Sequence, residues 1–354
     1  MEISRNLEQV KIILNLAKLQ ESDVKSESLY IKSNDEASHA VMCSNSLTFE
    51  LKEAETSNSM LLMPTLNKGP IVETVGERVL KMQEVHGVYH HYYEMKATKP
   101  KLQSVRNALK KFPYKGKNSE LSKEPLGLTF TELKETILAS EEEIFTELHT
   151  LPAVKFRNRW RLLHVSFLFG WVSYLDSILR EKNVSLEDVG RTEVEDWMAM
   201  YDDGNVNTKC ISLYIEGDED NLKWKSAAVS QLFAMYLLPD LRAFDSKDFF
   251  NAWQASVPIG VTPCEVHLHG VALVDYDSTP NIVKYLPEFE LPEEINDRLD
   301  ILFRTRAKWT MEAIAPYIQP LTDGNLNVAA LLTKYARSST VNGIKYYSSK
   351  YNTK

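Results

Sequence analysis

Two short helices followed by a β-ribbon, near the C-terminus, form the pattern that most constrains the fold of this chain. Thr310 can act as the N-cap of a first helix, and Pro320 ends that helix because proline donates no backbone hydrogen bond. After a turn at Asp323–Gly324, Asn325 can cap a second helix. Apolar residues recur at helical spacing in both: Met311, Ile314 and Ile318, then Val328, Leu331, Leu332 and Tyr335.

The residues that follow predict the ribbon. Asn342–Gly343 is typical of a tight hairpin turn, and the β-prone run 344–346 comes directly after it. Helix, turn, helix and ribbon in this order are typical of a winged helix, a variant of the helix-turn-helix. The same order is predicted in residues 129–163 and 246–286, and three such units in one chain support one another.

The unit at 129–163 carries capping boxes at Thr129–Glu132 and Ser140–Glu143, and a hairpin is predicted around Arg157–Asn158. The apolar residues of its two helices are Phe130, Leu133, Ile137, Ile144, Leu148 and Leu151. In the unit at 246–286, Ser246 can cap a first helix and Thr262–Pro263 can open a second. The flanking residues are predicted to contain helices at 194–201, 225–239 and 291–306 and a strand at 209–216.

A basic stretch, residues 96–117, predicts a helix between Pro100 and Pro113 that leads into the first unit. Its cationic residues are Lys101, Arg106, Lys110 and Lys111. We expect them to lie in solvent, and contact with nucleic-acid phosphates is the alternative.

Residues 1–95 are expected to be β-rich. Short β-prone runs occur at 28–33, 39–44, 47–55 and 59–64. Their apolar faces are incomplete, so the strands alone would bury a thin core. An open barrel completed by another chain fits this pattern, and a self-contained small barrel is the alternative.

The composition is that of a globular protein with several domains. The chain has 354 residues, of which 44% are hydrophobic and 25% charged, and a net charge of −8. Cys43, Cys210 and Cys264 are far apart, which fits a reducing compartment. The apolar run 162–179 contains His164 and Asp176, so we expect a buried amphipathic helix and no membrane span.

The C-terminal unit has the opposite charge to the rest of the chain. From Asn325 onward no acidic residue occurs. The basic residues there are Lys334, Arg337, Lys345, Lys350 and Lys354. Lys334 and Arg337 are expected on the second helix and Lys345 on the ribbon, so Lys334, Arg337, Lys345 and Lys350 are predicted to bind DNA. A solvated basic tail is the alternative.

Two other charged groups belong to the first unit. Glu141, Glu142 and Glu143 begin its second helix, where they repel phosphate and are predicted to bind protein or to serve the helix dipole alone. On its ribbon, the cations Lys155, Arg157, Arg159 and Arg161 alternate with aromatic residues. They form a second candidate DNA-binding wing, with a solvated hairpin face as the alternative. No helix carries a cluster suited to base edges, so DNA binding is expected to be weakly sequence-specific.

No pattern in the sequence indicates an enzyme. Phosphate loops, dinucleotide-binding glycine motifs and nucleophile elbows do not occur. His267 and His269 lie close together but have no third ligand at a matching spacing. We therefore expect no catalytic residues, no cofactor and no metal, and a catalytic metal site at these histidines is the rival hypothesis.

Several segments resemble the Dcc family of sister chromatid cohesion proteins. The segments that carry the resemblance are FELKEAETSNSMLLMP (49–64), KPKL…PYKG (99–116), ASEEEIFTEL (139–148), QASVP (254–258), GVALVD (270–275), KWTMEAIAPYIQ (308–319) and LLTKYARSS (331–339). They occur in the same order as in the family and span most of residues 40–354.

The resemblance implies a nuclear, non-enzymatic subunit of the cohesion-specific clamp loader, which is a replication factor C-like complex. It implies that the N-terminal β region folds with two partner subunits of the chromosome transmission fidelity group. It further implies that the C-terminal half contacts DNA polymerase epsilon, to which Glu141–Glu143 are the candidate contacts, and DNA. The ATPase activity and the sliding clamp, PCNA, would belong to partner chains.

The sequence thus predicts an α+β fold with an N-terminal β-barrel-like region and three tandem winged-helix units. The predicted domains are 1–95 for the barrel region, 96–184 for the first winged helix, 185–290 for the second with its preceding helices, and 291–354 for the third, basic one. A sequence-specific winged-helix regulator is the alternative function.

Overall fold

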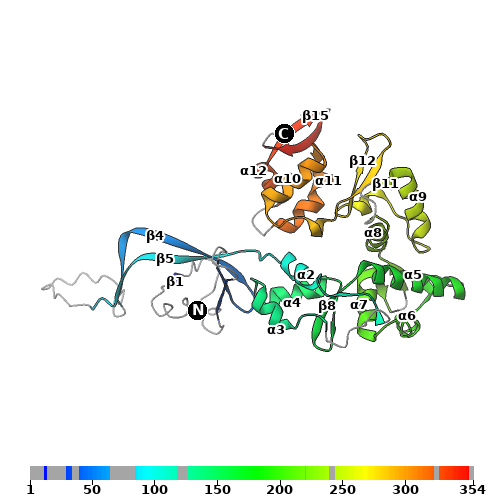
Figure 1. Ribbon diagram of the computed structural model, residues 1–354, viewed down its shortest axis with the longest axis horizontal. Coiled ribbons are helices and arrows are strands. Elements are labelled where there is room, and N and C mark those ends of the chain that lie inside the picture. The colour runs from blue at the N-terminus through cyan, green and yellow to red at the C-terminus, as the bar shows by residue number, and fades with distance from the viewer. Residues whose placement is uncertain are drawn as a thin grey trace, which may run out of the picture. The chain divides into compact units, whose positions relative to one another are not determined.

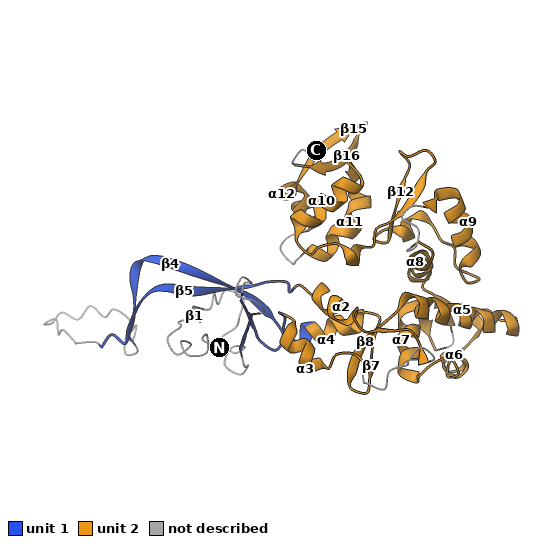
Figure 2. Ribbon diagram, in the orientation of Figure 1, with its two compact units in different colours: residues 1–100, 138–143 blue, residues 101–137, 144–354 orange. Residues whose placement is uncertain are grey.

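The computed structural model describes residues 12–13, 29–33, 40–63, 84–117, 126–219, 221–238, 244–322 and 327–350. They belong to two compact units (Figure 1, Figure 2). Unit 1 comprises Met1–Pro100 and Leu138–Glu143, and unit 2 comprises Lys101–Ile137 and Ile144–Lys354. The fold is mixed α+β, as predicted, with several small sheets.

Unit 1 is built on one five-stranded sheet in the order β1-β5-β4-β3-β2. The strands are β1 (Ile12–Ile13), β2 (Tyr30–Lys32), β3 (Val41–Cys43), β4 (Thr48–Leu62) and β5 (Gly87–Ala97). Strands β1 and β5 run parallel, and the other neighbours are antiparallel. In the described residues this sheet is open and not closed into a barrel, so they do not show the self-contained small barrel, and an open barrel completed by another chain stays a prediction. Among the sheet's described residues, the buried apolar cluster is formed by Met42, Phe49 and Met95.

Strand β4 joins two runs that were predicted to be separate strands, 47–55 and 59–64. The register between β4 and β5 shifts between Glu55 and Met60, so the polar residues between the two runs form an irregularity within one ribbon. Polar residues therefore interrupt the ladder without ending the strand.

Unit 2 begins with a helix, a short strand, two helices and a hairpin. Its elements are α2 (Gln103–Leu109), β6 (Pro113–Tyr114), α3 (Phe130–Thr136), α4 (Glu141–Thr150, whose first turn belongs to unit 1), β7 (Ala153–Phe156) and β8 (Arg159–Leu163). The capping box at Thr129–Glu132 is confirmed, and Arg157 and Asn158 have the positive φ angles of a tight hairpin turn.

The second segment repeats this order, which the sequence pattern does not predict for these residues. Its elements are α5 (Val165–Lys182), η4 (Leu186–Asp188), α6 (Arg191–Met198), α7 (Gly204–Tyr214), β9 (Ile215–Asp218) and β10 (Asn221–Trp224). The strand predicted at 209–216 is wrong, because most of it lies in α7. Val206, Cys210 and Tyr214 are buried at helical spacing. Gly217 lies in β9 at φ +115°, where a Cβ would meet the carbonyl oxygen of Asn221.

The third segment repeats the order with a reduced second helix. Its elements are α8 (Ser226–Leu237), β11 (Phe244–Asp245), α9 (Ser246–Ser256), η5 (Glu265–Leu268), β12 (Ala272–Asp275) and β13 (Ile282–Tyr285). Asp245, and not Ser246, caps α9, since its carboxylate accepts from the amides of Lys247 and Asp248. The short second helix predicted here is one 3-10 turn.

The fourth segment contains the two helices and the hairpin that the sequence predicts near the C-terminus. After the connecting turn η6 (Glu288–Glu290), its elements are α10 (Ile295–Thr305), β14 (Trp309–Thr310), α11 (Met311–Ile318), η7 (Gln319–Leu321), α12 (Val328–Tyr335), β15 (Ala336–Val341) and β16 (Ile344–Ser349). Thr310 caps α11 as predicted. The cap of α12 is Asn327, whose Oδ1 accepts from the Ala330 amide at 2.9 Å. Asn325 and the predicted turn at Asp323–Gly324 lie outside the described residues.

Three of the four segments share one sheet topology. In the sheets β6-β8-β7, β11-β13-β12 and β14-β16-β15, a short strand before the helix pair joins the second strand of the hairpin. The pairing is antiparallel in the last two and parallel in the first. Within the described part of the chain, the helix–helix–hairpin order therefore occurs four times, once more than predicted.

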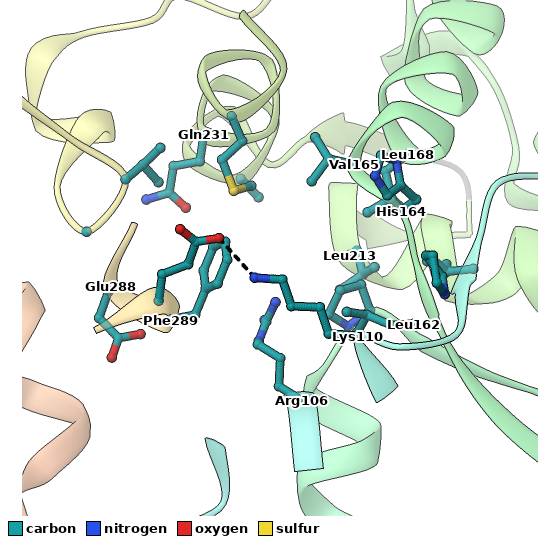
Figure 3. A pocket seen from close by; sticks show the side chains of 18 of the residues that line it. Arg106, Lys110, Leu162, His164, Val165, Leu168, Leu213, Gln231, Glu288 and Phe289 are labelled. Carbon is teal, nitrogen blue, oxygen red and sulfur yellow. Dashed lines mark hydrogen bonds and ion pairs between the residues drawn. The ribbon is translucent and has the colours of Figure 1, made fainter. Parts of the chain in front are cut away.

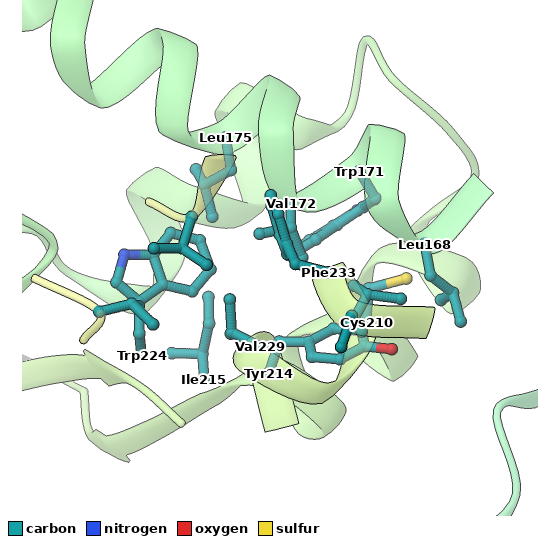
Figure 4. Packing of buried hydrophobic residues seen from close by; sticks show 14 of the residues in the cluster. Leu168, Trp171, Val172, Leu175, Cys210, Tyr214, Ile215, Trp224, Val229 and Phe233 are labelled. Atoms are coloured by element: carbon teal, nitrogen blue, oxygen red, sulfur yellow. The ribbon is translucent and has the colours of Figure 1, made fainter. Parts of the chain in front are cut away.

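One continuous hydrophobic cluster extends from Tyr114 to Val283 and joins the first three segments. Figure 4 shows part of this cluster, around α5 and α7. Helix α5 contributes Trp171, Val172 and Leu175, which confirms the buried amphipathic helix. No helix in the described residues is long and apolar enough to span a membrane.

Two buried polar groups anchor this core. The amide of Asn207 donates to the carbonyl oxygens of Met198 (2.7 Å) and Asp202 (2.9 Å), and its Oδ1 accepts from the Trp171 indole at 3.0 Å. The Asp202 carboxylate accepts from the Tyr114 hydroxyl at 2.8 Å. Each satisfied partner avoids the cost of burying an unpaired polar atom.

Helix α2 packs against residues 288–294, in the connection between the third and fourth segments. Gln103 donates from its backbone amide to Glu293 (2.8 Å) and from its side chain to the Leu291 carbonyl oxygen (3.0 Å). Lys101 and Lys110 form ion pairs with Glu294 (2.7 Å) and Glu290 (3.1 Å). The helix predicted between Pro100 and Pro113 is confirmed, but several of its cations contact protein.

Arg298 of α10 completes this junction from the interior. Its side chain is 1% exposed and its guanidinium donates to Glu288 Oε1 and to the Tyr317 carbonyl oxygen, both at 2.7 Å. It also donates to the carbonyl oxygens of Pro292 (2.6 Å) and Leu291 (3.1 Å). A buried cation is thus surrounded by acceptors, as a stable buried charge requires.

Candidate interaction surfaces

The C-terminal hairpin carries two of the four residues predicted to bind DNA, Arg337 and Lys345, and Arg337 lies on a different element from that expected. Helix α12 ends at Tyr335, and Ala336 already has extended backbone angles. Arg337 therefore lies on β15, and the prediction that Lys334 and Arg337 share one helix face is wrong. Lys334, Arg337 and Lys345 are exposed, and none forms an ion pair with a described carboxylate.

The strand register decides which of these charges face the same way. Arg337 is opposite Ser348, whereas Lys345 is opposite Thr340 and lies over the ring of Tyr347 at 5.3 Å. Because cross-strand partners share a face and neighbours alternate, Arg337 and Lys345 lie on opposite faces of the hairpin. Lys350 donates to the backbone oxygen of Lys334, so these two residues lie close together next to the hairpin. Lys354 lies outside the described residues.

The β7–β8 hairpin does not present four cations to solvent. Arg161 is 4% exposed and donates to the Pro113 carbonyl oxygen at 2.8 Å. Arg159 donates to the Gly127 carbonyl oxygen (2.8 Å) and to Glu132 (3.2 Å). Lys155 and Arg157 are exposed. The arginines of β8 thus stabilise the first segment. Of the four cations, the two exposed ones, Lys155 and Arg157, are accessible to a ligand.

The three glutamates at the start of α4 differ in their surroundings. The Glu143 carboxylate accepts from the Ser140 amide (3.1 Å) and the Glu143 amide donates to Ser140 Oγ (3.3 Å), which confirms the capping box. The same carboxylate accepts from Thr48 Oγ1 (2.6 Å), so within unit 1 the first turn of α4 contacts strand β4. The Glu142 amide donates to the Asn45 carbonyl oxygen at 3.1 Å, while its side chain is exposed. Glu141 is half-buried. Local structure therefore accounts for Glu143, and Glu142 is the member best placed for a partner.

Strand β2 presents apolar side chains at one edge of the unit 1 sheet. Leu29, Tyr30 and Ile31 are between 40% and 49% exposed, and β2 is the last strand in the sheet order. An edge strand offers unpaired backbone donors and acceptors, and apolar side chains on it favour addition of a further strand. This edge is suited to a partner chain.

The described residues contain no group of three His, Cys, Asp or Glu side chains able to hold a metal ion. His267 uses its Nδ1 to accept from the Cys264 amide at 3.4 Å, within the single turn of η5. It therefore serves a local turn.

The sequence pattern missed the residues that join α2 to the connection at 288–294. Gln103 and Arg298 carry the junction, but their separation in sequence hides it. Arg106, expected in solvent, is half-buried with its guanidinium carbon 4.5 Å from the centre of the Phe289 ring. Its position one residue after the buried Val105 was the available signal, because it places the side chain beside the apolar stripe.

Comparison with known proteins gives a consistent result across most of the chain. The family described as "Sister chromatid cohesion protein Dcc1" matches residues 8–318. A sister chromatid cohesion protein of Mus musculus, DCC1, is 32% identical over 329 residues, covering 91% of this chain and 82% of its own length. The Homo sapiens protein of that name is also 32% identical, covering 89% and 82%. A relative from Saccharomyces cerevisiae is 23% identical over 364 residues, covering 93% and 92%.

Proposed function

Because this chain belongs to the Dcc1 family of sister chromatid cohesion proteins, we propose that it acts in cohesion as a non-enzymatic subunit of a replication factor C-like clamp loader in the nucleus. Its proposed partners are the clamp-loader subunits of the chromosome transmission fidelity group, DNA polymerase epsilon and DNA. PCNA would be reached indirectly through the complex. The observation that carries this proposal is the apolar strand β2 at the edge of the described sheet of unit 1, which a partner strand would extend.

The four helix–helix–hairpin segments support the second half of the proposal. We interpret them as winged helices, because a short strand, a helix pair and a hairpin occur in the order typical of that motif. The exposed hairpin of the fourth segment carries cations that form no ion pair with a described carboxylate, and the first segment carries the exposed Glu142. Contact with DNA at one end of the array and with the polymerase at the other follows from this division of charge.

The first test addresses the partner edge. Ile31→Asp places a charge on β2, where Ile31 is 45% exposed, and should weaken binding to the co-expressed partner subunits at least about tenfold. The measurement is quantitative co-purification with the full chain. Leu47→Asp is the matched control, since Leu47 is 44% exposed in the turn before β4 and does not lie on the edge strand. Equal effects of both substitutions would refute the edge as the binding surface.

The second test addresses DNA. Replacing Lys334, Arg337, Lys345 and Lys350 together by Glu should abolish duplex binding by the full chain. Removing one phosphate contact should lower the salt slope of log K by roughly 0.9, whatever the base sequence. Binding is measured by fluorescence anisotropy at several salt concentrations.

The control for the DNA test carries the same change in net charge at exposed lysines elsewhere, namely Lys96, Lys111, Lys223 and Lys247. It should retain the affinity of the natural chain for DNA to within a small factor. Unchanged binding after reversal of the C-terminal set would leave a solvated basic end, with DNA held by partner chains. Preference of roughly a thousandfold or more for one DNA sequence would instead favour a sequence-specific regulator.

A further inference from the structure

Unit 2 contains a cavity of about 710 Å³ that none of the proposed contacts uses (Figure 3). Its walls come from the first three segments, from the connection to the fourth and from Pro316 of α11. A volume of this size is typical of preformed ligand sites in proteins. The apolar part of the wall includes Leu162, Val165, Leu168, Leu213 and Met235.

Arg106 is the polar group that distinguishes this cavity. It extends from α2 toward Phe289, and its guanidinium stacks 4.5 Å from the centre of that ring (Figure 3). Burial lowers the pKa of Arg106. No described residue accepts a hydrogen bond from its guanidinium. An arginine fork offers five N–H donors matched to a carboxylate, so its donors remain available to a ligand.

The carboxylates that line the cavity are already engaged. Glu288 is paired with Arg298 at 2.7 Å, and Glu290 is paired with Lys110 at 3.1 Å. Lys115, also in the wall, is exposed and forms no ion pair with a described residue. Among the described residues that line the cavity, Arg106 and Lys115 are therefore the cations that form no ion pair with a carboxylate.

We propose that this cavity binds a peptide segment of a partner protein in which a carboxylate side chain stands beside bulky apolar side chains. Arg106 takes the carboxylate, and the wall formed by α5, α7 and α8 buries the apolar side chains. The occupant is a peptide because Asn107, Lys110 and Glu290 at the rim are exposed, so a chain can enter while its flanking residues stay in solvent. The proposal is independent of the clamp-loader role, since it uses neither β2 nor the C-terminal hairpin.

The probe is a phage-displayed library of random peptides, selected on the immobilised full chain. The expected outcome is enrichment of sequences with Asp or Glu next to aromatic or aliphatic residues. One enriched peptide is then synthesised with a fluorescent label, together with a version in which Gln or Asn replaces its acidic residue. Failure to enrich an acidic and apolar pattern would overturn the proposal.

Two variants test the site by different means. Arg106→Met keeps an apolar stem against Phe289 but removes the donors, and should raise the Kd for the acidic peptide at least about tenfold. Ala228→Phe fills the cavity from α8 and should abolish binding. Lys111→Met is the matched control, because Lys111 follows α2 closely, is exposed and does not line the cavity.

The four combinations of protein and peptide give the decisive comparison. Exchange of the peptide's acid for its amide should weaken binding to the natural chain about tenfold and leave binding to Arg106→Met almost unchanged. Circular dichroism confirms that each variant is folded. Equal losses in Arg106→Met and Lys111→Met, or full binding by Ala228→Phe, would show that the peptide binds elsewhere and would overturn the assignment.

Discussion

Arg298→Met is expected to lower the free energy of unfolding by roughly 3 to 5 kcal/mol. The substitution leaves Glu288 without its cation and removes donors from the carbonyl oxygens of Leu291, Pro292 and Tyr317. Methionine fills much of the space but supplies no donor, so the desolvated acceptors remain unpaired. Urea unfolding followed by tryptophan fluorescence measures the change.

The same helix supplies the control. Arg304 pairs with Asp300 at 2.7 Å, but its side chain is 70% exposed, so Arg304→Met should cost less than about 1 kcal/mol. Adding Glu288→Gln to Arg298→Met should restore part of the loss, because it removes the uncompensated charge. Similar effects of Arg298→Met and Arg304→Met would mean that the buried network contributes no more than a surface ion pair.

Asn207→Asp is the second substitution with a large expected effect, at least about 3 kcal/mol. The amide nitrogen now donates to two buried carbonyl oxygens, and a carboxylate would place an acceptor against both of them. The side chain is almost fully buried, so water cannot relieve the repulsion. The neighbouring carboxylate of Asp202, also buried, adds a like charge.

The pH dependence of Asn207→Asp identifies the cause. The pKa of an aspartate introduced at this position should be raised in the folded chain, so proton uptake favours the folded state. The stability gap to the natural chain should therefore narrow as pH falls through that raised pKa. Asn205→Asp is the control, because Asn205 is exposed in the first turn of α7, where a negative charge is mildly favourable. A gap that stayed constant with pH would exclude buried ionisation as its origin.

Local signals in the sequence predicted many helix starts correctly. The capping boxes at Thr129 and Ser140 and the N-cap at Thr310 involve residues three apart, so they are visible without knowledge of the fold. The hairpin turns at Asn158 and Asn342 were predictable from equally local signals, because asparagine tolerates the positive φ angles of tight turns. Both residues adopt positive φ in the structure.

Helix ends and strand lengths were predicted less well, because tertiary pairing decides them. No glycine or proline comes directly after Tyr335 to mark the end of α12 in the sequence. The helix ends there because β15 begins at Ala336, where it pairs with β16. The stretch 209–216 has apolar residues that suit a strand as well as a helix. Burial of Cys210 and Tyr214 on the face of α7 that packs into the core settles the choice.

The cavity and the junction around Arg298 could not have been predicted, since both join residues that are distant in sequence. Charge alone placed Arg106 and Arg161 on solvated faces. In the structure, Arg106 stacks on Phe289 and Arg161 is buried against the backbone of Pro113. Such contacts depend on which segments of the array meet, and periodicity carries no information about that.

The docking of α2 has a consequence for folding while the chain is being synthesised. Gln103 and the carbonyl oxygen of Leu291 that it reaches are separated by 188 positions in the sequence. At about 5 to 20 residues per second, a ribosome needs roughly 10 to 40 s to synthesise the stretch between them. During that interval Val105 and Leu109 are made long before residues 288–294, and the cations of α2 have none of their final acidic partners. The nascent chain therefore exposes a basic, amphipathic helix, and a chaperone or a partner subunit that covers it would have its best opportunity before translation ends.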